Sequence, residues 1–285
     1  MTSLQKTISN KINCNGIGLH SGTEVKMTLI PTKANHGIIF KRTDIQDKNN
    51  LIKANYKNVT QTTLGTVISN SEGVHLSTIE HFMAALWCLE IDNLLIEIDN
   101  AEMPIMDGSS EPFIFLLECA GVKTLEEPRK IIEILKNITF KDADKYVSVK
   151  PSQSFSIDLG IDFNHKHITE NNYKFSESHS SFKSDISRAR TFCFEHEIKY
   201  MQQNNLAKGG SLDNAIVVSD NGILNKSPMR YKDEFVKHKI LDFIGDIYLA
   251  GNRISGEFNA FKTGHGVNNQ FLRKLFEDKS NYRLV

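Results

Sequence analysis

The chain has 285 residues, of which 40% are hydrophobic and 24% are charged, and its formal net charge at pH 7 is zero. These values are typical of a packed globular protein and leave room for one large domain or two of ordinary size. The balanced charge argues against a nucleic-acid-binding protein, which normally carries a basic excess.

The sequence contains no membrane or secretion segment that we can recognise. No apolar run reaches the roughly 18 residues needed to cross a bilayer, and the first residues lack the apolar core of a signal peptide. We therefore expect a cytoplasmic protein without a transmembrane segment. The four cysteines form no Cys-x-x-Cys pair, so neither a disulfide framework nor a thiolate metal site is expected.

The first third of the chain is expected to be rich in β-strands, with helices following. Residues 23–31 place Val25, Met27 and Leu29 on one face, as a half-buried strand does. A helix is expected to begin near Ser77, where Ser77 and Glu80 fit a capping box. The other expected elements are strands at 37–42 and 93–99, a glycine-rich turn at 15–22, a turn at 104–110 and a helix at 112–121.

A polar segment at 122–130, which contains Pro128, is expected to link two domains. The second half then repeats the plan of the first. Its expected strands are 145–151, 154–163, 189–194, 214–224 and 252–261, and its expected helices are 195–203, 233–250 and 267–276. We expect a loop at 164–184 and a frayed tail after Asp278. The repeated plan indicates an α+β fold of two similar domains.

The helix expected at 233–250 carries the clearest chemical pattern. With His238 set at zero, Asp242 and Asp246 lie at about 40° and 80° around the helix, on a face separate from its apolar residues. Residues four apart are neighbours on a helix, so His238 and Asp242 can reach one metal ion. Taken alone, however, this pattern is more typical of a polar face exposed to solvent.

Further histidines strengthen the metal interpretation. Glu80 and His81 stand at the start of another expected helix, and His265 lies between two glycines. Two histidines with one carboxylate form a catalytic zinc set that leaves a position for water. Such a site also needs a base and often an acid, which Glu80 and His265 could supply. Glu80 could equally serve only to close the capping box with Ser77.

Ordered motifs along nearly the whole chain resemble one family. They include QKTISNKINCNGIGLHSG, LSTIEHFMAAL, MPIMDGSSEPF, ARTF, GGSLDNAIV, DEFVKHKILDFIGDIYLAG and KTGHGVNN. The chain is similar to the UDP-3-O-acyl-N-acetylglucosamine deacetylases (LpxC family) of lipid A biosynthesis. The resemblance implies two β-α-α-β sandwich domains, each with a small insert and with the active site between them. We expect these domains at 1–126 and 127–285, with the acyl-chain insert near 191–215.

The resemblance also implies a role for each matching residue. The implied zinc ligands are His81, His238 and Asp242, with Glu80 as general base, His265 as general acid, Asp246 as the carboxylate that orients it, and Thr191 as an oxyanion donor. The implied acyl-chain contacts are Phe192, Leu206, Ala207 and Gly210. The implied contacts to the diphosphate and UDP are Lys239, Lys262, Lys145, Asp162 and Phe163.

The implied reaction is zinc-dependent hydrolysis of the N-acetyl group of UDP-3-O-(3-hydroxyacyl)-N-acetylglucosamine, by a monomer. The same ligands could accept Fe²⁺. Two alternatives stay open: a zinc hydrolase for another amide or ester, and an inactive relative that binds a UDP-sugar or an acyl chain.

Overall fold

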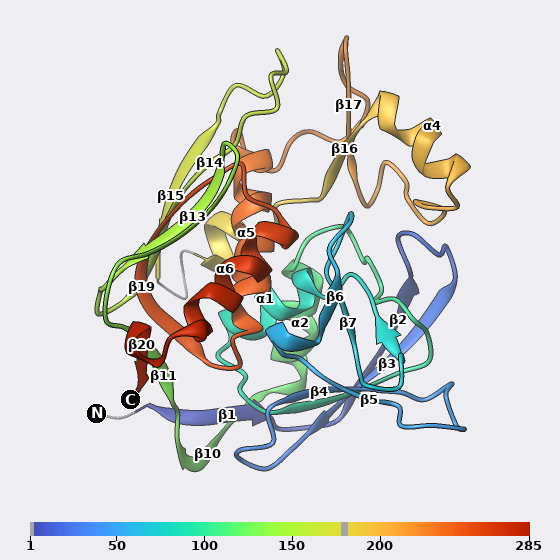
Figure 1. The fold of residues 1–285 in the computed structure, drawn as a ribbon. Helices are drawn as coiled ribbons and strands as arrows, with labels where there is room; N and C mark the ends of the chain where they lie inside the picture. The colour runs from blue at the N-terminus through green and yellow to red at the C-terminus, as the bar shows by residue number, and fades with distance from the viewer. Residues whose placement is uncertain (1–2, 178–181) are drawn as a thin grey trace.

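Two larger sheets enclose a layer of helices in the computed structural model, which describes residues 3–177 and 182–285 (Figure 1). The first sheet has the order β2 (Ile12–Ile17), β3 (Glu24–Pro31), β9 (Leu94–Ile98), β4 (Ile38–Arg42), β5 (Leu51–Lys53). The second has the order β12 (Ile138–Asp142), β13 (Lys145–Lys150), β19 (Arg253–Phe261), β11 (Ile131–Ile134), β20 (Tyr282–Leu284), with β14 (Phe155–Gly160) beside β19 and β15 (Asn172–Ser176) beyond it.

The two halves repeat one arrangement around a central strand. β9 lies between antiparallel β3 and parallel β4, and β19 lies between antiparallel β13 and parallel β14. Helices α1 (Glu80–Cys88) and α2 (Glu111–Ala120) stand before and after β9, as α5 (Glu234–Tyr248) and α6 (His265–Glu277) do around β19. The predicted α+β class is therefore confirmed, while the domain boundary at 126/127 stays a prediction.

Each half also contains smaller elements outside the two larger sheets. The first half carries β6 (Val59–Gln61), β7 (Val67–Ser69) and β8 (His75–Leu76), which follow the short helix η1 (Tyr56–Asn58). The second half carries β16 (Phe192–Phe194), α4 (Glu195–Gln203), β17 (Ile216–Ser219) and β18 (Gly222–Ile223). The element β16–α4–β17 covers the region where the insert is expected, and it projects at the top of Figure 1.

The segment 122–130, expected to link the two domains, is largely a strand. β10 (Val122–Pro128) pairs antiparallel with β1 (Leu4–Ile8) in a separate two-stranded sheet. Most of β10 is exposed, so its sequence lacks the apolar alternation that identifies a half-buried strand.

Two expectations for the second half are wrong in part: the frayed tail after Asp278 and the loop at 164–184 both contain regular elements. The turn η3 (Lys279–Asn281) leads into β20, which pairs with β11, and the buried Asn281 donates to the Leu275 carbonyl oxygen at 2.9 Å. Within 164–184, β15 pairs with β14 and buries Phe175, and a π-helical turn, η2 (Phe182–Ile186), follows. Residues 178–181 of that segment lie outside the described residues.

Helices α1 and α5, one from each half, pack directly against each other. A glycine makes this approach possible: a Cβ atom on Gly245 would lie 2.0 Å from the backbone oxygen of Glu80. The close crossing brings the first turn of α1 against the middle of α5, so that side chains from both halves share one buried space. Among the described helices, none is both long and apolar enough to cross a membrane.

Candidate metal and catalytic site

Three buried side chains meet where α1 crosses α5. His81 comes from α1, His238 and Asp242 come from α5, and their potential ligand atoms all lie within 4.8 Å of one another. Asp242 Oδ1 is 3.5 Å from His81 Nε2 and 3.4 Å from His238 Nε2. Each residue is no more than 4% exposed, so this helix face is not a solvated polar surface.

The surroundings of these residues fit a bound divalent cation. His238 Nδ1 lies 3.0 Å from the Ala189 carbonyl oxygen, to which it must donate, and this leaves Nε2 free as a ligand. Burial lowers the pKa of His238 to about 3, which keeps the imidazole neutral. Lys239 Nζ donates a hydrogen bond to Asp242 Oδ2 at 2.7 Å, whereas the buried Oδ1 of Asp242 has no hydrogen-bond partner among the described residues. Two imidazole nitrogens and one such carboxylate oxygen suit Zn²⁺ or Fe²⁺.

Glu80, the first residue of α1, lies beside this cluster and is 3% exposed. The predicted capping box is wrong, because Ser77 Oγ donates to the Ala101 carbonyl oxygen and no side chain caps α1. The Glu80 carboxylate instead accepts the Thr66 backbone N–H at 2.9 Å. Burial raises the pKa of Glu80, although His265 and His81 oppose that rise. A carboxylate with a raised pKa is suited to accept a proton near neutral pH.

His265 begins α6 and faces Asp246 of α5. Its Nδ1 lies 2.8 Å from Asp246 Oδ2, and the same oxygen accepts from Asn268 Nδ2 at 2.8 Å. Burial alone would lower the pKa of His265, but the negative charges of Asp246 and Glu80 raise it to about 9. The imidazole is therefore cationic at neutral pH and can donate a proton.

Three connected cavities surround these groups. A central cavity of about 210 Å³ is lined by Glu80, His81, Thr191, His238, Asp242 and His265, among others. The polar pocket, of about 740 Å³, shares Phe163, Lys239 and His265 with it. The apolar pocket, of about 690 Å³, shares Leu64, Thr191 and Phe192 with it.

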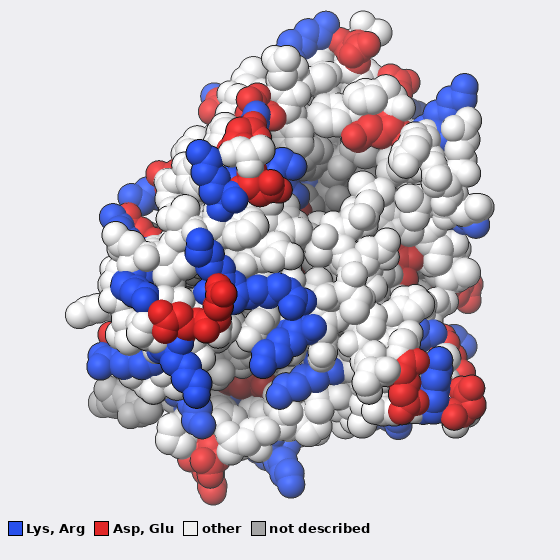
Figure 2. Space-filling model, viewed as in Figure 1, with Lys and Arg blue, Asp and Glu red and all other residues white. Residues whose placement is uncertain are grey.

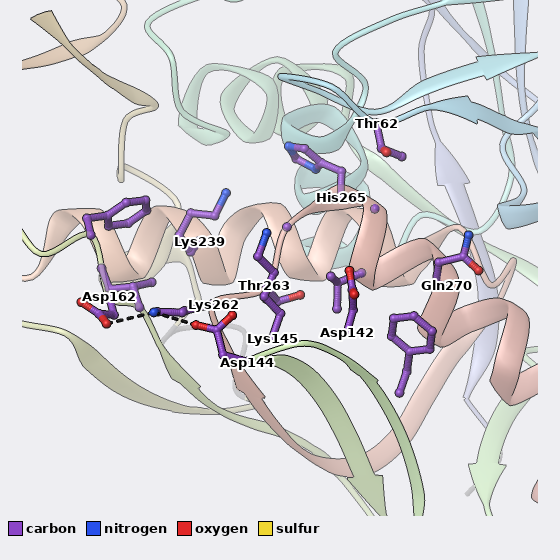
Figure 3. Close-up of a pocket in the computed structure, with 16 residues that line it drawn as sticks. Thr62, Asp142, Asp144, Lys145, Asp162, Lys239, Lys262, Thr263, His265 and Gln270 are labelled. Carbon is purple, nitrogen blue, oxygen red and sulfur yellow. Dashed lines mark hydrogen bonds and ion pairs between the residues drawn. The ribbon is translucent and has the colours of Figure 1, made fainter. Parts of the chain in front are cut away.

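The polar pocket contains every residue expected to contact the nucleotide: Lys145, Asp162, Phe163, Lys239 and Lys262. In Figure 3, Lys239 extends from α5, and Lys262 lies between two carboxylates. Lys262 Nζ is 2.8 Å from Asp144 Oδ2 and 3.0 Å from Asp162 Oδ2. Figure 2 shows Lys and Arg gathered on this face around α6.

The apolar pocket contains the residues expected to contact the acyl chain: Phe192, Leu206, Ala207 and Gly210. Both halves build it, because the insert docks on the glycine-rich segment at 15–22. Gly209 N donates to the Leu19 carbonyl oxygen at 3.0 Å, and a Cβ on Gly209 would lie 2.3 Å from the Gly18 oxygen. The surface between α4 and β2 is mostly uncharged in Figure 2.

The structure thus brings all the predicted site residues to one region, although their roles stay predictions. It also adds residues that the sequence reasoning missed, notably Thr66, Asn268 and Leu19. Asn268 could have been found, because it lies three residues after His265 and so on the same face of α6. Thr66 has no comparable pattern, because it reaches the site from a turn.

Comparison with known proteins decides the family. The family model "LpxC: UDP-3-O-acyl N-acetylglycosamine deacetylase" matches residues 5–277. The chain belongs to this family. Proteins named UDP-3-O-acyl-N-acetylglucosamine deacetylase from Shewanella frigidimarina, Shewanella violacea and Shewanella baltica are 46%, 47% and 45% identical to it, each over 99% of this chain and 92% of the relative.

The LpxC match includes every element that contributes to the site, from the glycine-rich segment at 15–22 to the start of α6. The predicted family is therefore confirmed.

Proposed function

We propose that the protein hydrolyses the N-acetyl amide of UDP-3-O-(3-hydroxyacyl)-N-acetylglucosamine, a step of lipid A biosynthesis, and releases acetate. One observation carries the proposal: a polar pocket and an apolar pocket both adjoin a buried set of potential metal ligands, a base and an acid. An amphiphilic substrate with its reactive amide between its two ends matches this arrangement.

The two ends of the substrate would occupy different pockets. Lys239 and Lys262 would bind the diphosphate, and Lys145, Asp162 and Phe163 would contact the UDP moiety. The acyl chain would lie along Phe192, Leu206, Ala207 and Gly210. The acetamide would then lie in the central cavity, beside Glu80 and Thr191.

The residues around the central cavity have complementary proton chemistry. Glu80 would take a proton from the attacking water, and the Thr191 hydroxyl would donate to the oxyanion that develops on the amide oxygen. His265, held cationic by Asp246, would protonate the leaving amine nitrogen. His81, His238 and Asp242 would hold the metal, and a divalent ion there would supply Lewis acidity toward water and the amide carbonyl.

We propose Zn²⁺ as the ion, and Fe²⁺ is the alternative that these ligands also accept. The protein is proposed to act as a monomer in the cytoplasm, with no nucleic-acid partner; these points rest on the family resemblance and on composition.

The test is acetate release from the proposed substrate, measured before chelation, after chelation, and after addition of less than one equivalent of Zn²⁺. Activity that disappears and returns supports both the substrate and the metal requirement. Folded, metal-loaded protein without activity would contradict the proposal. Turnover of simpler amides or esters would then favour another hydrolase, and tight UDP-sugar binding without turnover would favour an inactive binder.

A further inference from the structure

Thr66 reaches the catalytic groups from the turn between β6 and β7, and nothing above assigns it a role. Thr66 is 2% exposed, and a buried threonine hydroxyl needs a hydrogen-bond partner. Both of its polar donors point into the site. Its backbone N–H donates to Glu80 Oε2 at 2.9 Å, and its hydroxyl donates to Asp246 Oδ1 at 2.6 Å.

These two contacts join the proposed base, Glu80, to Asp246, the carboxylate that orients the proposed acid His265. Glu80 belongs to α1 of the first half, and Asp246 belongs to α5 of the second half. Thr66 therefore bridges Glu80 and Asp246 where the two helices cross. The 2.6 Å distance is short for a hydrogen bond and typical of a hydroxyl that donates to a carboxylate.

Asp246 is held by donors on both oxygens. His265 Nδ1 and Asn268 Nδ2 lie at Oδ2, and the Thr66 hydroxyl is the donor at Oδ1. Asn268 is itself oriented, because Thr263 Oγ1 donates to its amide oxygen. Loss of the hydroxyl would leave Oδ1 without that donor and allow the carboxylate to rotate away from His265.

We propose that Thr66 is a positioning residue for the proposed reaction: its hydroxyl fixes the Asp246 carboxylate so that Oδ2 faces His265 Nδ1. This inference rests on the proposed deacetylation. If the hydrogen bond from Thr66 to Asp246 were only structural, its loss would lower thermal stability alone. If it positions Asp246, its loss also slows the chemical step in protein that remains folded and metal-loaded.

The experiment compares Thr66→Val with Thr66→Ser. Valine has nearly the shape of threonine and keeps the backbone N–H on Glu80, so it removes the hydroxyl contact to Asp246 alone. We expect Thr66→Val to lower kcat by about 10- to 100-fold, as is typical when a residue that supports a catalytic group is lost. KM and bound metal should change less than about twofold, and Thr66→Ser should restore most of kcat.

Thr60→Val is the matched control, because Thr60 lies on β6 of the same hairpin but is exposed, and its hydroxyl bonds to Ser69 Oγ at 2.7 Å, away from the catalytic groups. It should keep wild-type kcat. A Thr66→Val kcat within about twofold of wild type would overturn the inference, as would equal losses in the valine and serine variants. If the valine variant does not fold, Thr66→Ala replaces it in the same comparison.

A second measurement does not depend on activity. In ¹⁵N-histidine-labelled protein, the His265 resonances are identified by their loss in His265→Gln, and the Nδ1 resonance reports the hydrogen bond to Asp246. We expect it to move in Thr66→Val but not in Thr66→Ser, and an unchanged resonance would contradict the positioning role. Wild-type protein that releases no acetate would refute the proposed function, while this resonance would still decide whether Thr66 holds Asp246.

Discussion

The polar and apolar pockets both adjoin the cavity that holds the metal-ligand cluster, but they are built in different ways. The lysines of the polar pocket come from or next to regular elements: Lys239 lies on α5, Lys145 begins β13, and Lys262 directly follows β19. The apolar pocket is assembled from the insert around α4, together with Leu19 and Leu64 of the first half. The first pocket thus offers charged side chains, and the second offers a mostly apolar wall made by three separate segments.

This difference gives the substrate a direction. A diphosphate in the apolar pocket would lose its hydration without gaining cationic partners, which is costly. An acyl chain in the polar pocket would gain little apolar contact. For the proposed substrate, the polarity of the two pockets would therefore favour one orientation, and that orientation would place the acetamide at the cluster. The variants below test the shared centre first and then each pocket separately.

The largest effect is expected at Glu80, where the two pockets meet. Glu80→Gln keeps the shape of the side chain but removes its ability to accept a proton. We expect kcat to fall by about 10²- to 10⁴-fold, while bound metal and the affinity for UDP stay near wild type. The measurements are acetate release, metal content and UDP binding.

Asp242→Ala is the contrast to Glu80→Gln, because Asp242 Oδ1 is an expected metal ligand. It should lose bound metal together with activity. Near-full activity in Glu80→Gln would show that Glu80 is not the base, and unchanged metal content in Asp242→Ala would remove Asp242 from the ligand set.

Lys262→Met tests the polar pocket alone. It removes a cation and leaves Asp144 and Asp162 without that partner, so the pocket should repel a diphosphate. We expect the Kd for UDP and the KM for the substrate to rise about 10-fold, which corresponds to about 1.4 kcal/mol, with little change in kcat. Lys262→Arg, which keeps the charge, is the control. If both variants bind UDP as wild type does, Lys262 makes no contact with the diphosphate.

Val217→Phe tests the apolar pocket alone. Val217 lies on β17, lines the pocket and is 6% exposed. The larger ring would displace about two methylene groups of a long acyl chain, each worth about 0.8 kcal/mol, so kcat/KM for long-chain substrates should fall about 10-fold. Short-chain substrates should be unaffected, whereas Val217→Ala should favour longer chains. An equal loss for all chain lengths would show that the acyl chain does not lie along β17.

The smallest effect is expected away from both pockets, at Glu90. Burial would raise its pKa, but the hydrogen bond from Lys6 and the charge of Arg129 lower it to about 2. Glu90 therefore stabilises the folded protein fully above its pKa in the unfolded chain, near 4.5, and this contribution is lost as the pH falls through its folded-state pKa of about 2. After allowance for solvent screening, we expect about 1 kcal/mol of unfolding free energy.

Denaturant unfolding between pH 7 and pH 2 measures this contribution. The drop should be smaller in Glu90→Gln, while acetate release at pH 7 stays at the wild-type rate. A Glu90→Gln protein with the full wild-type pH dependence would contradict the contribution of Glu90. The variant also serves as the reference for stability changes that do not involve either pocket.

Local patterns predicted the regular elements well where one face is buried. The alternation of Val25, Met27 and Leu29 predicted β3, and those three side chains are at most 1% exposed. The same reasoning failed for β10 and β20, because strands that are largely exposed need no apolar alternation. It also misjudged Ser77, whose hydroxyl bonds to a distant carbonyl rather than to the helix beside it.

The sequence by itself determined the family, the α+β class and the residue types of the site, because these depend on ordered motifs and on the spacing of His238 and Asp242 along one helix. Only the tertiary structure decided that His81 lies within reach of Asp242, that Gly245 allows α1 to meet α5, and that Thr66 contacts both Glu80 and Asp246. These contacts join residues far apart in the chain. Their geometry depends on how whole helices and turns pack, which no local pattern of residues encodes.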